Sequence, residues 1–205
     1  MPVKLTPLKD LRVLKHQIPA YGLTPNTSIQ NKPLLIYKSA FPANVMAGEI
    51  EEHLRSVGVV SPQWRYTMYS RSHFHVSSSR IHRKSTCESD RTFSNTRPTS
   101  QTTSHEVLGI AHGKAKLCFG HEENPQHVEE TVGKGDVVVI PAGVAHRLLE
   151  DIEGGFSMVG CYPGGCSWDM AYGEEGEEER IEGIRRLRWF ERDPVYGDGG
   201  PAVGV

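Results

Sequence analysis

The sequence predicts an all-β fold, a β-sandwich or barrel, from the pattern of its second half. Short apolar runs recur there, in "HEVLGIAHGKAKLCFG", "ETVGKGDVVVIPAGVAHRLLE" and "GGFSMVGCYP". Gly, Pro and Asn turn signals separate the runs, which is typical of successive antiparallel strands. One run, Val137–Ile140, is apolar at every position. A run of this kind indicates a strand that is covered on both faces.

The length and composition are those of one soluble globular domain. The chain has 205 residues and a formal net charge of −2. A balanced charge without a basic patch argues against nucleic acid as a partner, and no apolar run reaches the roughly 20 residues of a membrane helix. The N-terminus carries no apolar stretch of the secretory kind, so we expect a cytoplasmic protein.

The chain has four cysteines, Cys87, Cys118, Cys161 and Cys166. An even count permits two disulfides, but none of the four forms a Cys-x-x-Cys pair and a reducing compartment is expected. We therefore expect free thiols. Cys118 and Cys161 fall in runs that are predicted to be strands, where a buried, inert thiol is the ordinary outcome.

Other elements precede and follow the predicted barrel. Residues 1–40 are punctuated by Pro and Gly and predict an extended arm with a strand or two. Within residues 41–60, apolar side chains recur at helical spacing, namely at Met46, Ile50, Leu54 and Val57. This spacing predicts a surface helix, which Gly58 can end.

The end of the chain predicts a peripheral extension. An acidic stretch, "GEEGEEER", is expected to be a solvated surface segment. A short helix or strand after it is expected to pack Ile184, Leu187 and Trp189 on the core. We thus expect an N-terminal arm and helix over residues 1–60, a barrel core over residues 61–165, and a C-terminal extension over residues 166–205 that packs on the barrel.

Residues 76–103 interrupt the barrel core. Nearly half of them are Ser or Thr, apolar residues are scarce, and neither helical nor strand periodicity is present. The segment predicts a disordered or loosely ordered insertion. A second hypothesis is that the run is non-native coding, such as translated intron sequence in a gene model. Sequencing of the mature transcript decides between them, because a message that contains the run refutes the second hypothesis.

His73 and His75 stand directly before this insertion. In a strand, alternate side chains share a face, so both imidazoles would lie on one side and Phe74 on the other. Imidazole is a common ligand of borderline divalent metals, although a His-x-His pair alone is weak support for a metal site.

His105 and Glu106 follow the insertion, and as neighbours on a strand they would face opposite sides. Without the insertion, the two histidines and Glu106 would stand on a hairpin. A long loop in place of a tight turn costs little extra closure entropy, because that cost grows with the logarithm of loop length. We expect His105 to be exposed, with a role as an outer partner of a metal site as the alternative.

A fourth candidate comes from "GDVVVIPAGVAH". Pro141 ends a buried strand and Gly143 allows a turn, after which His146 enters the next strand. A histidine in this position can point between the sheets. From this stretch alone, a capping or hydrogen-bonded core histidine is an equally good interpretation.

Together these residues resemble the two motifs of the cupin superfamily. The second motif, G-x5-P-x-G-x2-H-x3-N, is matched at full spacing except that Glu150 stands at its last position. The first motif, G-x5-H-x-H-x(3,4)-E-x6-G, is met by four residues, namely His73, His75, Glu106 and Gly113. It departs at Thr67, where the leading Gly would fall, and in the long segment between His75 and Glu106. The flanking segments are similar to a branch of small single-domain cupins of unassigned activity.

The resemblance implies a double-stranded β-helix, also called a jelly-roll barrel, with a divalent metal inside it. The implied ligands are His73, His75, Glu106 and His146. Three imidazoles and one carboxylate suit Fe, Mn, Ni, Cu or Zn without selecting among them. Cupins often dimerise through barrel edges, so the resemblance also implies a homodimer.

Two functions are compatible with such a site. The first is a metal-dependent enzyme of dioxygenase or isomerase type that acts on a small molecule. The second is a non-catalytic cupin that binds or senses a small molecule without turnover. The sequence contains no nucleophile elbow, phosphate loop or dinucleotide fingerprint, and it identifies neither the substrate nor the metal.

Overall fold

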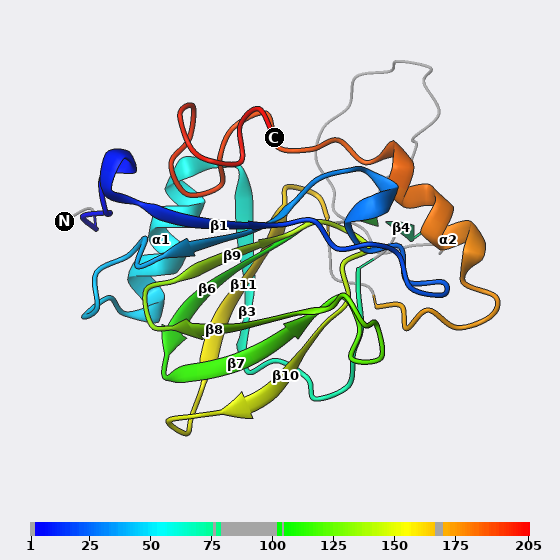
Figure 1. The fold of residues 1–205 in the computed structure, drawn as a ribbon. Coiled ribbons are helices and arrows are strands. Elements are labelled where there is room, and N and C mark those ends of the chain that lie inside the picture. Colours follow the sequence, from blue (N-terminus) through cyan, green and yellow to red (C-terminus); the bar gives the residue numbers. More distant parts are fainter. Residues whose placement is uncertain (1–2, 76, 79–101, 104, 167–169) are drawn as a thin grey trace, which may run out of the picture.

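A computed structural model of the chain describes residues 3–75, 77–78, 102–103, 105–166 and 170–205. Two antiparallel β-sheets face each other in it (Figure 1). The strand order is β1-β2-β9-β6-β11-β3 in the larger sheet and β10-β7-β8 in the smaller one. The predicted all-β fold is therefore confirmed.

The larger sheet consists of β1 (Arg12–His16), β2 (Leu34–Lys38), β3 (Val60–Tyr66), β6 (Glu106–His112), β9 (Val137–Ile140) and β11 (Ser157–Pro163). The smaller sheet consists of β7 (Lys114–Phe119), β8 (Val128–Gly133) and β10 (His146–Asp151). From β6 to β11 the chain passes back and forth between the two sheets. This winding is that of a double-stranded β-helix.

Strand alternation divides the larger sheet between two apolar cores. In β9, Val138 and Ile140 face the smaller sheet, while Val137 and Val139 face the outer side. All four side chains are buried, as predicted from the continuous apolar run. Because successive strand residues point to opposite faces, one run of four apolar residues supplies both cores.

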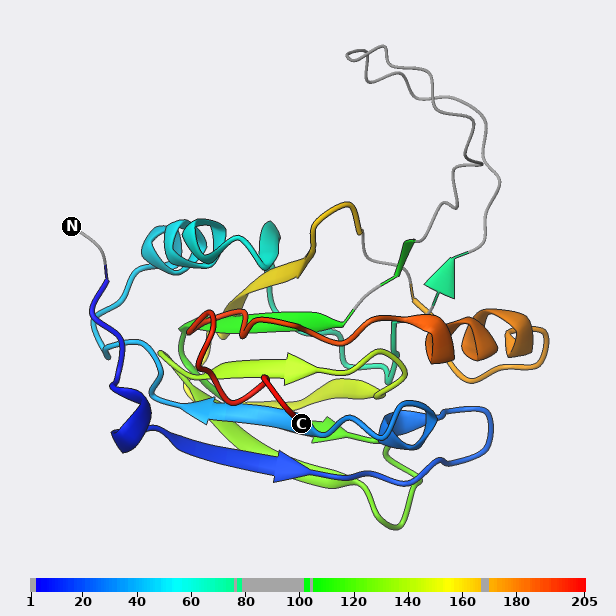
Figure 2. The same cartoon turned by 90° about the horizontal axis from the view of Figure 1, so that it is seen from above.

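Helix α1 (Ala47–Val57) covers the outer face of the larger sheet, where Figure 2 shows it in cyan. Ile50 and Leu54 are buried against the sheet, and Gly58 ends the helix in the left-handed conformation with φ 75°. Met46 was expected on the buried face. It instead precedes the first helical residue and is 64% exposed, because the helix begins one residue later than its apolar pattern.

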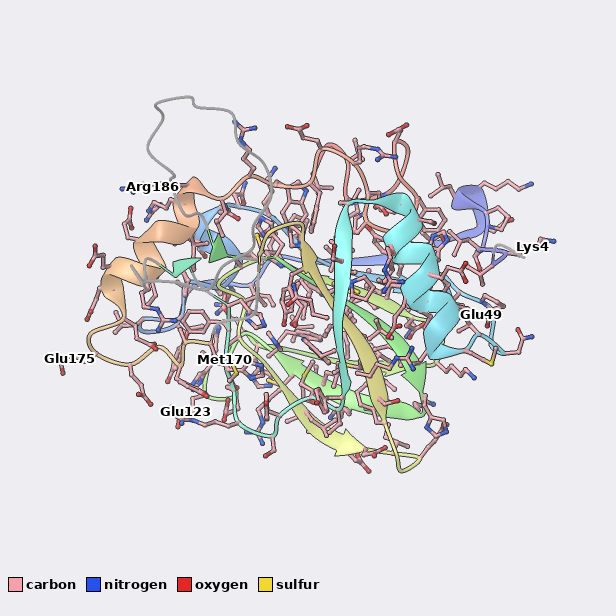
Figure 3. The ribbon with its side chains drawn as sticks, turned by 180° about the vertical axis from the view of Figure 1, so that it is seen from behind. Lys4, Glu49, Glu123, Met170, Glu175 and Arg186 are labelled. Atoms are coloured by element: carbon pink, nitrogen blue, oxygen red, sulfur yellow. The ribbon has the colours of Figure 1, made fainter. Side chains whose placement is uncertain are left out.

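The C-terminal segment contains α2 (Glu178–Gly183) and the 3-10 helix η3 (Ile184–Arg186). Two further 3-10 turns, η1 (Leu8–Asp10) and η2 (Asn26–Ile29), lie in the N-terminal segment. Seen from behind, α2 lies at the opposite end of the molecule from Glu49 in α1 (Figure 3). None of the helices in the described part of the chain has the length and hydropathy needed to cross a membrane.

The predicted insertion over residues 76–103 is described only at its two ends. There β4 (Ser77–Ser78) pairs with β5 (Thr102–Thr103), and the prediction of a disordered or loosely ordered loop concerns mainly the residues between these two strands. The pairing closes the hairpin that the sequence suggested between the histidine pair and Glu106. The rest of the insertion, with Cys87, lies outside the described residues. Cys118 and Cys161 are free thiols, as predicted.

A buried carboxylate attaches the C-terminal segment to the larger sheet. Asp193 is fully buried and accepts a hydrogen bond of 2.7 Å from the hydroxyl of Tyr37 in β2. It also accepts bonds from the backbone N–H groups of Val195, Tyr196 and Ala202, at 2.8 to 2.9 Å. Four donors therefore depend on one side chain, and they come from parts of the chain far apart in sequence.

We predict that Asp193→Ala destabilises the fold, because it leaves those donors buried without an acceptor. The free energy of unfolding should fall by about 3 kcal/mol. Urea denaturation measures it. Asp198→Ala is the matched control, since its carboxylate is exposed and the change should cost less than about 0.5 kcal/mol. Equal unfolding midpoints for the two variants would contradict the proposed anchor.

Candidate metal centre

His73 and His75 lie on an extended segment that is held on both sides. His73 exchanges two backbone hydrogen bonds with His146, at 2.8 and 3.3 Å, and Phe74 exchanges two with Ala171, at 2.8 and 3.0 Å. Neighbouring residues thus bond to opposite sides, as in a strand. Both imidazoles turn inward, while the ring of Phe74 packs in a separate apolar cluster. The expected division of faces is observed.

His146 enters the site from a tight turn at the start of β10. The N–H of Val144 donates to the carbonyl of Pro141 at 3.1 Å, which closes the turn, and Gly143 lies at φ 90°. The N–H of Gly143 also donates to the carbonyl of His75 at 2.9 Å. The turn therefore positions His146 and holds the histidine pair at the same time.

Strand parity in β6 places Glu106 in the same interior. Leu108 and Ile110 face the smaller sheet, and Glu106 stands two residues before Leu108 on the same face. Its carboxylate is 2% exposed. Val107 faces the outer core instead. Of the adjacent pair His105 and Glu106, the interior side chain is thus the carboxylate.

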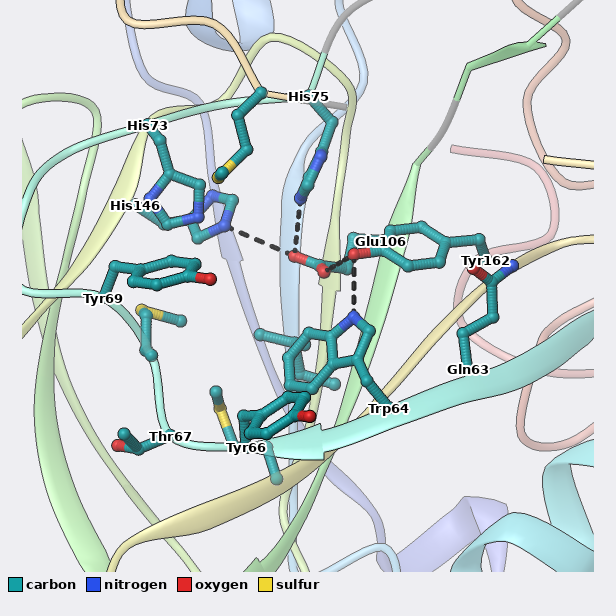
Figure 4. Close-up of a pocket in the computed structure, with 14 residues that line it drawn as sticks. Gln63, Trp64, Tyr66, Thr67, Tyr69, His73, His75, Glu106, His146 and Tyr162 are labelled. Carbon is teal, nitrogen blue, oxygen red and sulfur yellow. Dashed lines mark hydrogen bonds and ion pairs between the residues drawn. The ribbon is translucent and has the colours of Figure 1, made fainter. Parts of the chain in front are cut away.

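The three predicted histidines cluster, and Glu106 lies beside two of them. Ligand atoms of His73, His75 and His146 all lie within 4.8 Å of one another. Oε2 of Glu106 is 3.3 Å from Nε2 of His75 and 3.3 Å from Nε2 of His146. Figure 4 shows the carboxylate facing the rings of His75 and His146. The side chains come from a bridged segment and two strands that are far apart in sequence.

The surroundings favour a neutral imidazole at His73 and an ionised carboxylate at Glu106. Burial, followed by the neighbouring ring of His146, lowers the pKa of His73 to about 3. Burial acts to raise the pKa of Glu106, but the rings of His75 and His146 outweigh it and hold that pKa well below its usual value. Metal coordination needs these two protonation states.

The tautomers of two rings can be read from their backbone contacts. Nδ1 of His73 lies 3.1 Å from the carbonyl of Arg71, and Nδ1 of His146 lies 3.0 Å from that of Val144. A carbonyl only accepts, so each Nδ1 carries a proton, and the nitrogen of each ring that is directed into the site is Nε2. Nε2 of His146 faces Oε2 of Glu106 at 3.3 Å. Imidazole nitrogens and a carboxylate oxygen are ligands that a divalent metal accepts, so this donor set fits such an ion.

The site opens into a cavity of about 490 Å³, a volume that suits a small-molecule ligand. The walls are mainly aromatic and thioether side chains, with a few polar groups (Figure 4). Beyond the four candidate ligands, the lining residues are Gln63, Trp64, Tyr66, Thr67, Met68, Tyr69, Leu108, Met158, Tyr162 and Met170. The sequence analysis identified none of these as site residues.

Strand parity could have identified Tyr162. In β11, Val159 and Cys161 pack in the outer core, while Met158 packs between the sheets. Tyr162 shares the parity of Met158 and therefore faces the interior. Its hydroxyl donates a hydrogen bond of 2.5 Å to Oε1 of Glu106. Its position on the inner face of a predicted strand could therefore have identified Tyr162 as a candidate site residue.

The prediction that His105 is exposed was wrong. His105 is 2% exposed and its ring packs against Trp189 and Phe190 of the C-terminal segment. Nδ1 accepts from the N–H of Ala142, and Nε2–H donates to the carbonyl of Arg188, both at 3.1 Å. Burial lowers the pKa of His105 to about 4, which keeps the ring neutral. The polar sequence before His105 concealed that the outer face of the sheet is covered there.

Of the other positions in the two cupin motifs, this sequence matches some and departs from others. The glycines of the two motifs, Gly113, Gly135 and Gly143, all have positive φ, between 73° and 92°. A side chain on Gly135 would also meet the carbonyl oxygen of Phe41 at 2.6 Å. The two departures, Thr67 and Glu150, are both exposed. Neither departure replaces one of the four candidate ligands, although Thr67 lines the cavity.

No family model matches the chain. The chain is 34% identical over 105 residues to the uncharacterized protein YjlB of Bacillus subtilis (strain 168). The aligned part covers 51% of this chain and 61% of that protein, so the chain spans about three fifths of its relative. The relative has no assigned activity, in agreement with the expected resemblance to small cupins of unassigned activity.

Among solved structures, the chain is similar to dTDP-4-dehydrorhamnose 3,5-epimerase from Elizabethkingia anophelis NUHP1. The identity is 13%, the TM-score is 0.27, and the match covers 80% of this chain and 74% of that one. A likeness this distant assigns no activity. The fold assignment rests on the strand order and the two facing sheets described above.

We predict that His105 stabilises the fold without binding the metal. His105→Ala removes two buried hydrogen bonds and a ring packed on two aromatic side chains, so the free energy of unfolding should fall by about 3 kcal/mol. Divalent metal affinity should stay within a few-fold of the wild-type value. His112→Ala is the control, because His112 is an exposed histidine. Loss of metal binding in a folded His105→Ala protein would contradict this assignment.

Proposed function

We propose that the protein is a metal-dependent enzyme that acts on a small molecule, by chemistry of the dioxygenase or isomerase type. One observation carries the proposal: three imidazoles and one carboxylate converge at a cavity between two β-sheets. A bound divalent cation, Fe, Mn, Ni, Cu or Zn, would supply Lewis acidity and a template for oxygen-bearing groups. His73, His75, Glu106 and His146 would hold it.

The chain's own side chains support the binding of a small molecule beside that cation. Four aromatic residues and three methionines line the cavity, namely Trp64, Tyr66, Tyr69, Tyr162, Met68, Met158 and Met170. Aromatic rings and thioethers contact apolar ligand surface well, and Met adapts to irregular shapes. The proposed substrate therefore has an apolar body and turns an oxygen-bearing end toward the four ligands. The apolar walls also exclude water from the reacting end.

The free thiols of Cys118 and Cys161 support a reducing compartment, such as the cytoplasm, as the place where the protein acts. Cys118 and Cys161 are buried, and burial raises the pKa of both thiols, to about 11 for Cys118. They are therefore held as neutral thiols. We assign them no role in the proposed reaction.

We predict that the purified protein contains a stoichiometric divalent metal that His75→Ala loses. Loss of a residue that only hydrogen-bonds to a metal ligand weakens metal binding by about 10- to 100-fold. Removal of a ligand itself should weaken it further. Metal analysis of wild type, His75→Ala and the exposed-site control His112→Ala measures this. Equal metal content in wild type and His75→Ala would remove His75 from the ligand set.

Turnover separates the enzyme from the non-catalytic alternative. The metal-loaded protein is assayed with a panel of small diols, keto acids and sugars, before and after a chelator. Turnover that the chelator abolishes and added metal restores supports the enzyme. A folded, metal-loaded protein that binds members of the panel and converts none would support a sensor instead.

A further inference from the structure

The two carboxylate oxygens of Glu106 have different partners. Oε2 faces the Nε2 atoms of His75 and His146, at 3.3 Å from each. Oε1 accepts the hydroxyl proton of Tyr162 at 2.5 Å, on the side away from the histidines (Figure 4). Tyr162 therefore fixes Oε1 of the carboxylate, while Oε2 faces the histidines and is available to a metal ion.

The direction of the hydrogen bond to Oε1 is fixed by a third residue. Nε1–H of Trp64 donates to the hydroxyl oxygen of Tyr162 at 3.0 Å. An indole N–H has no acceptor function, so Tyr162 accepts from Trp64 and its own proton is left for Glu106. Oε1 of Glu106 is the acceptor that this proton meets, at 2.5 Å. The hydrogen bonds therefore run in one direction: Trp64 donates to Tyr162, and Tyr162 donates to Glu106.

The backbone of β11 permits this arrangement. Gly160 lies directly across from Trp64 in the pairing of β11 with β3. A Cβ atom on Gly160 would lie 2.0 Å from Cε2 of Trp64, so the indole ring rests on a position that only glycine leaves open. The register of the two strands also shifts between Gly160 and Cys161. A register shift of this kind changes the direction of nearby side chains, and this one lies directly before Tyr162 in β11.

We propose that Tyr162, held by Trp64, is a positioning residue that makes Glu106 a one-oxygen ligand. With Oε1 bonded to Tyr162, only Oε2 is free to meet a cation among the three imidazoles. The proposal rests on the proposed function, since it concerns the same site. It goes beyond the ligand set because it assigns a task to two residues outside both sequence motifs.

The strength of the contact supports a positioning task. Tyr162 is 1% exposed and Glu106 is 2% exposed, so water does not compete for Oε1. Hydrogen bonds to an ionised acceptor are shorter and roughly twice as strong as neutral ones. The ring of Tyr162 also packs edge-on against His75, at 5.4 Å between centroids. One side chain thus restrains two of the four candidate ligands.

The test is a titration of the metal-free protein with Co²⁺, which reports affinity and, through its visible absorption spectrum, the coordination geometry. Tyr162→Phe should bind Co²⁺ about 10- to 100-fold more weakly than wild type. Its spectrum should also change, because the freed Oε1 can approach the cation. Tyr66→Phe is the matched control: it removes the hydroxyl of an exposed tyrosine that lines the same cavity. Its affinity and spectrum should match wild type.

Trp64→Phe supplies a second variant that leaves Tyr162 and Glu106 in place, and it carries the test if Tyr162→Phe does not fold. It should weaken Co²⁺ binding less than Tyr162→Phe does and shift the spectrum in the same direction. Wild-type affinity and spectrum in the folded variants would overturn the positioning role while leaving the proposed function standing. An equal loss in Tyr66→Phe would also overturn that role. Wild-type protein that binds no Co²⁺ would refute the proposed function, and this inference with it.

Discussion

A buried carboxylate beside two imidazoles of a three-histidine cluster is the constraint on which the rest of this structure depends. Removing an ionised group from water costs several kcal/mol unless partners offset the loss. For Glu106 the partners are the nitrogens of His75 and His146 on one side and the hydroxyl of Tyr162 on the other. The proposed cation among the histidines would complete this balance, because it would attract both the ring nitrogens and the carboxylate.

The two cores hold these partners in register. Glu106, the first residue of β6, faces the interior and belongs to the site. His105, directly before it, faces outward, and its ring donates a hydrogen bond to the carbonyl of Arg188 in the C-terminal segment. That segment is in turn fixed to β2 by Asp193. The cavity therefore lies between sheets whose outer face is closed by α1 and by the chain's own C-terminal segment.

Much of this arrangement could be predicted from sequence, and the misses have physical reasons. Local turn chemistry and strand parity indicated the sheets, His146 and the shared face of His73 and His75. The exposure of His105 was misjudged, because the cover over it comes from residues more than eighty positions later. Tyr162 was missed although its inner-face position in β11 could have indicated it. Trp64 was missed because its hydrogen bond to Tyr162 depends on the pairing of β3 with β11, which sequence spacing does not encode.

The most direct measurement is anomalous diffraction from crystals of the metal-loaded protein, recorded on both sides of the absorption edge of the metal. The account predicts one strong peak at about 2.0 to 2.2 Å from Nε2 of the three histidines and from Oε2 of Glu106. A peak held by other residues would contradict it. So would a peak to which Glu106 contributes no oxygen, or the absence of a peak from crystals grown with excess metal.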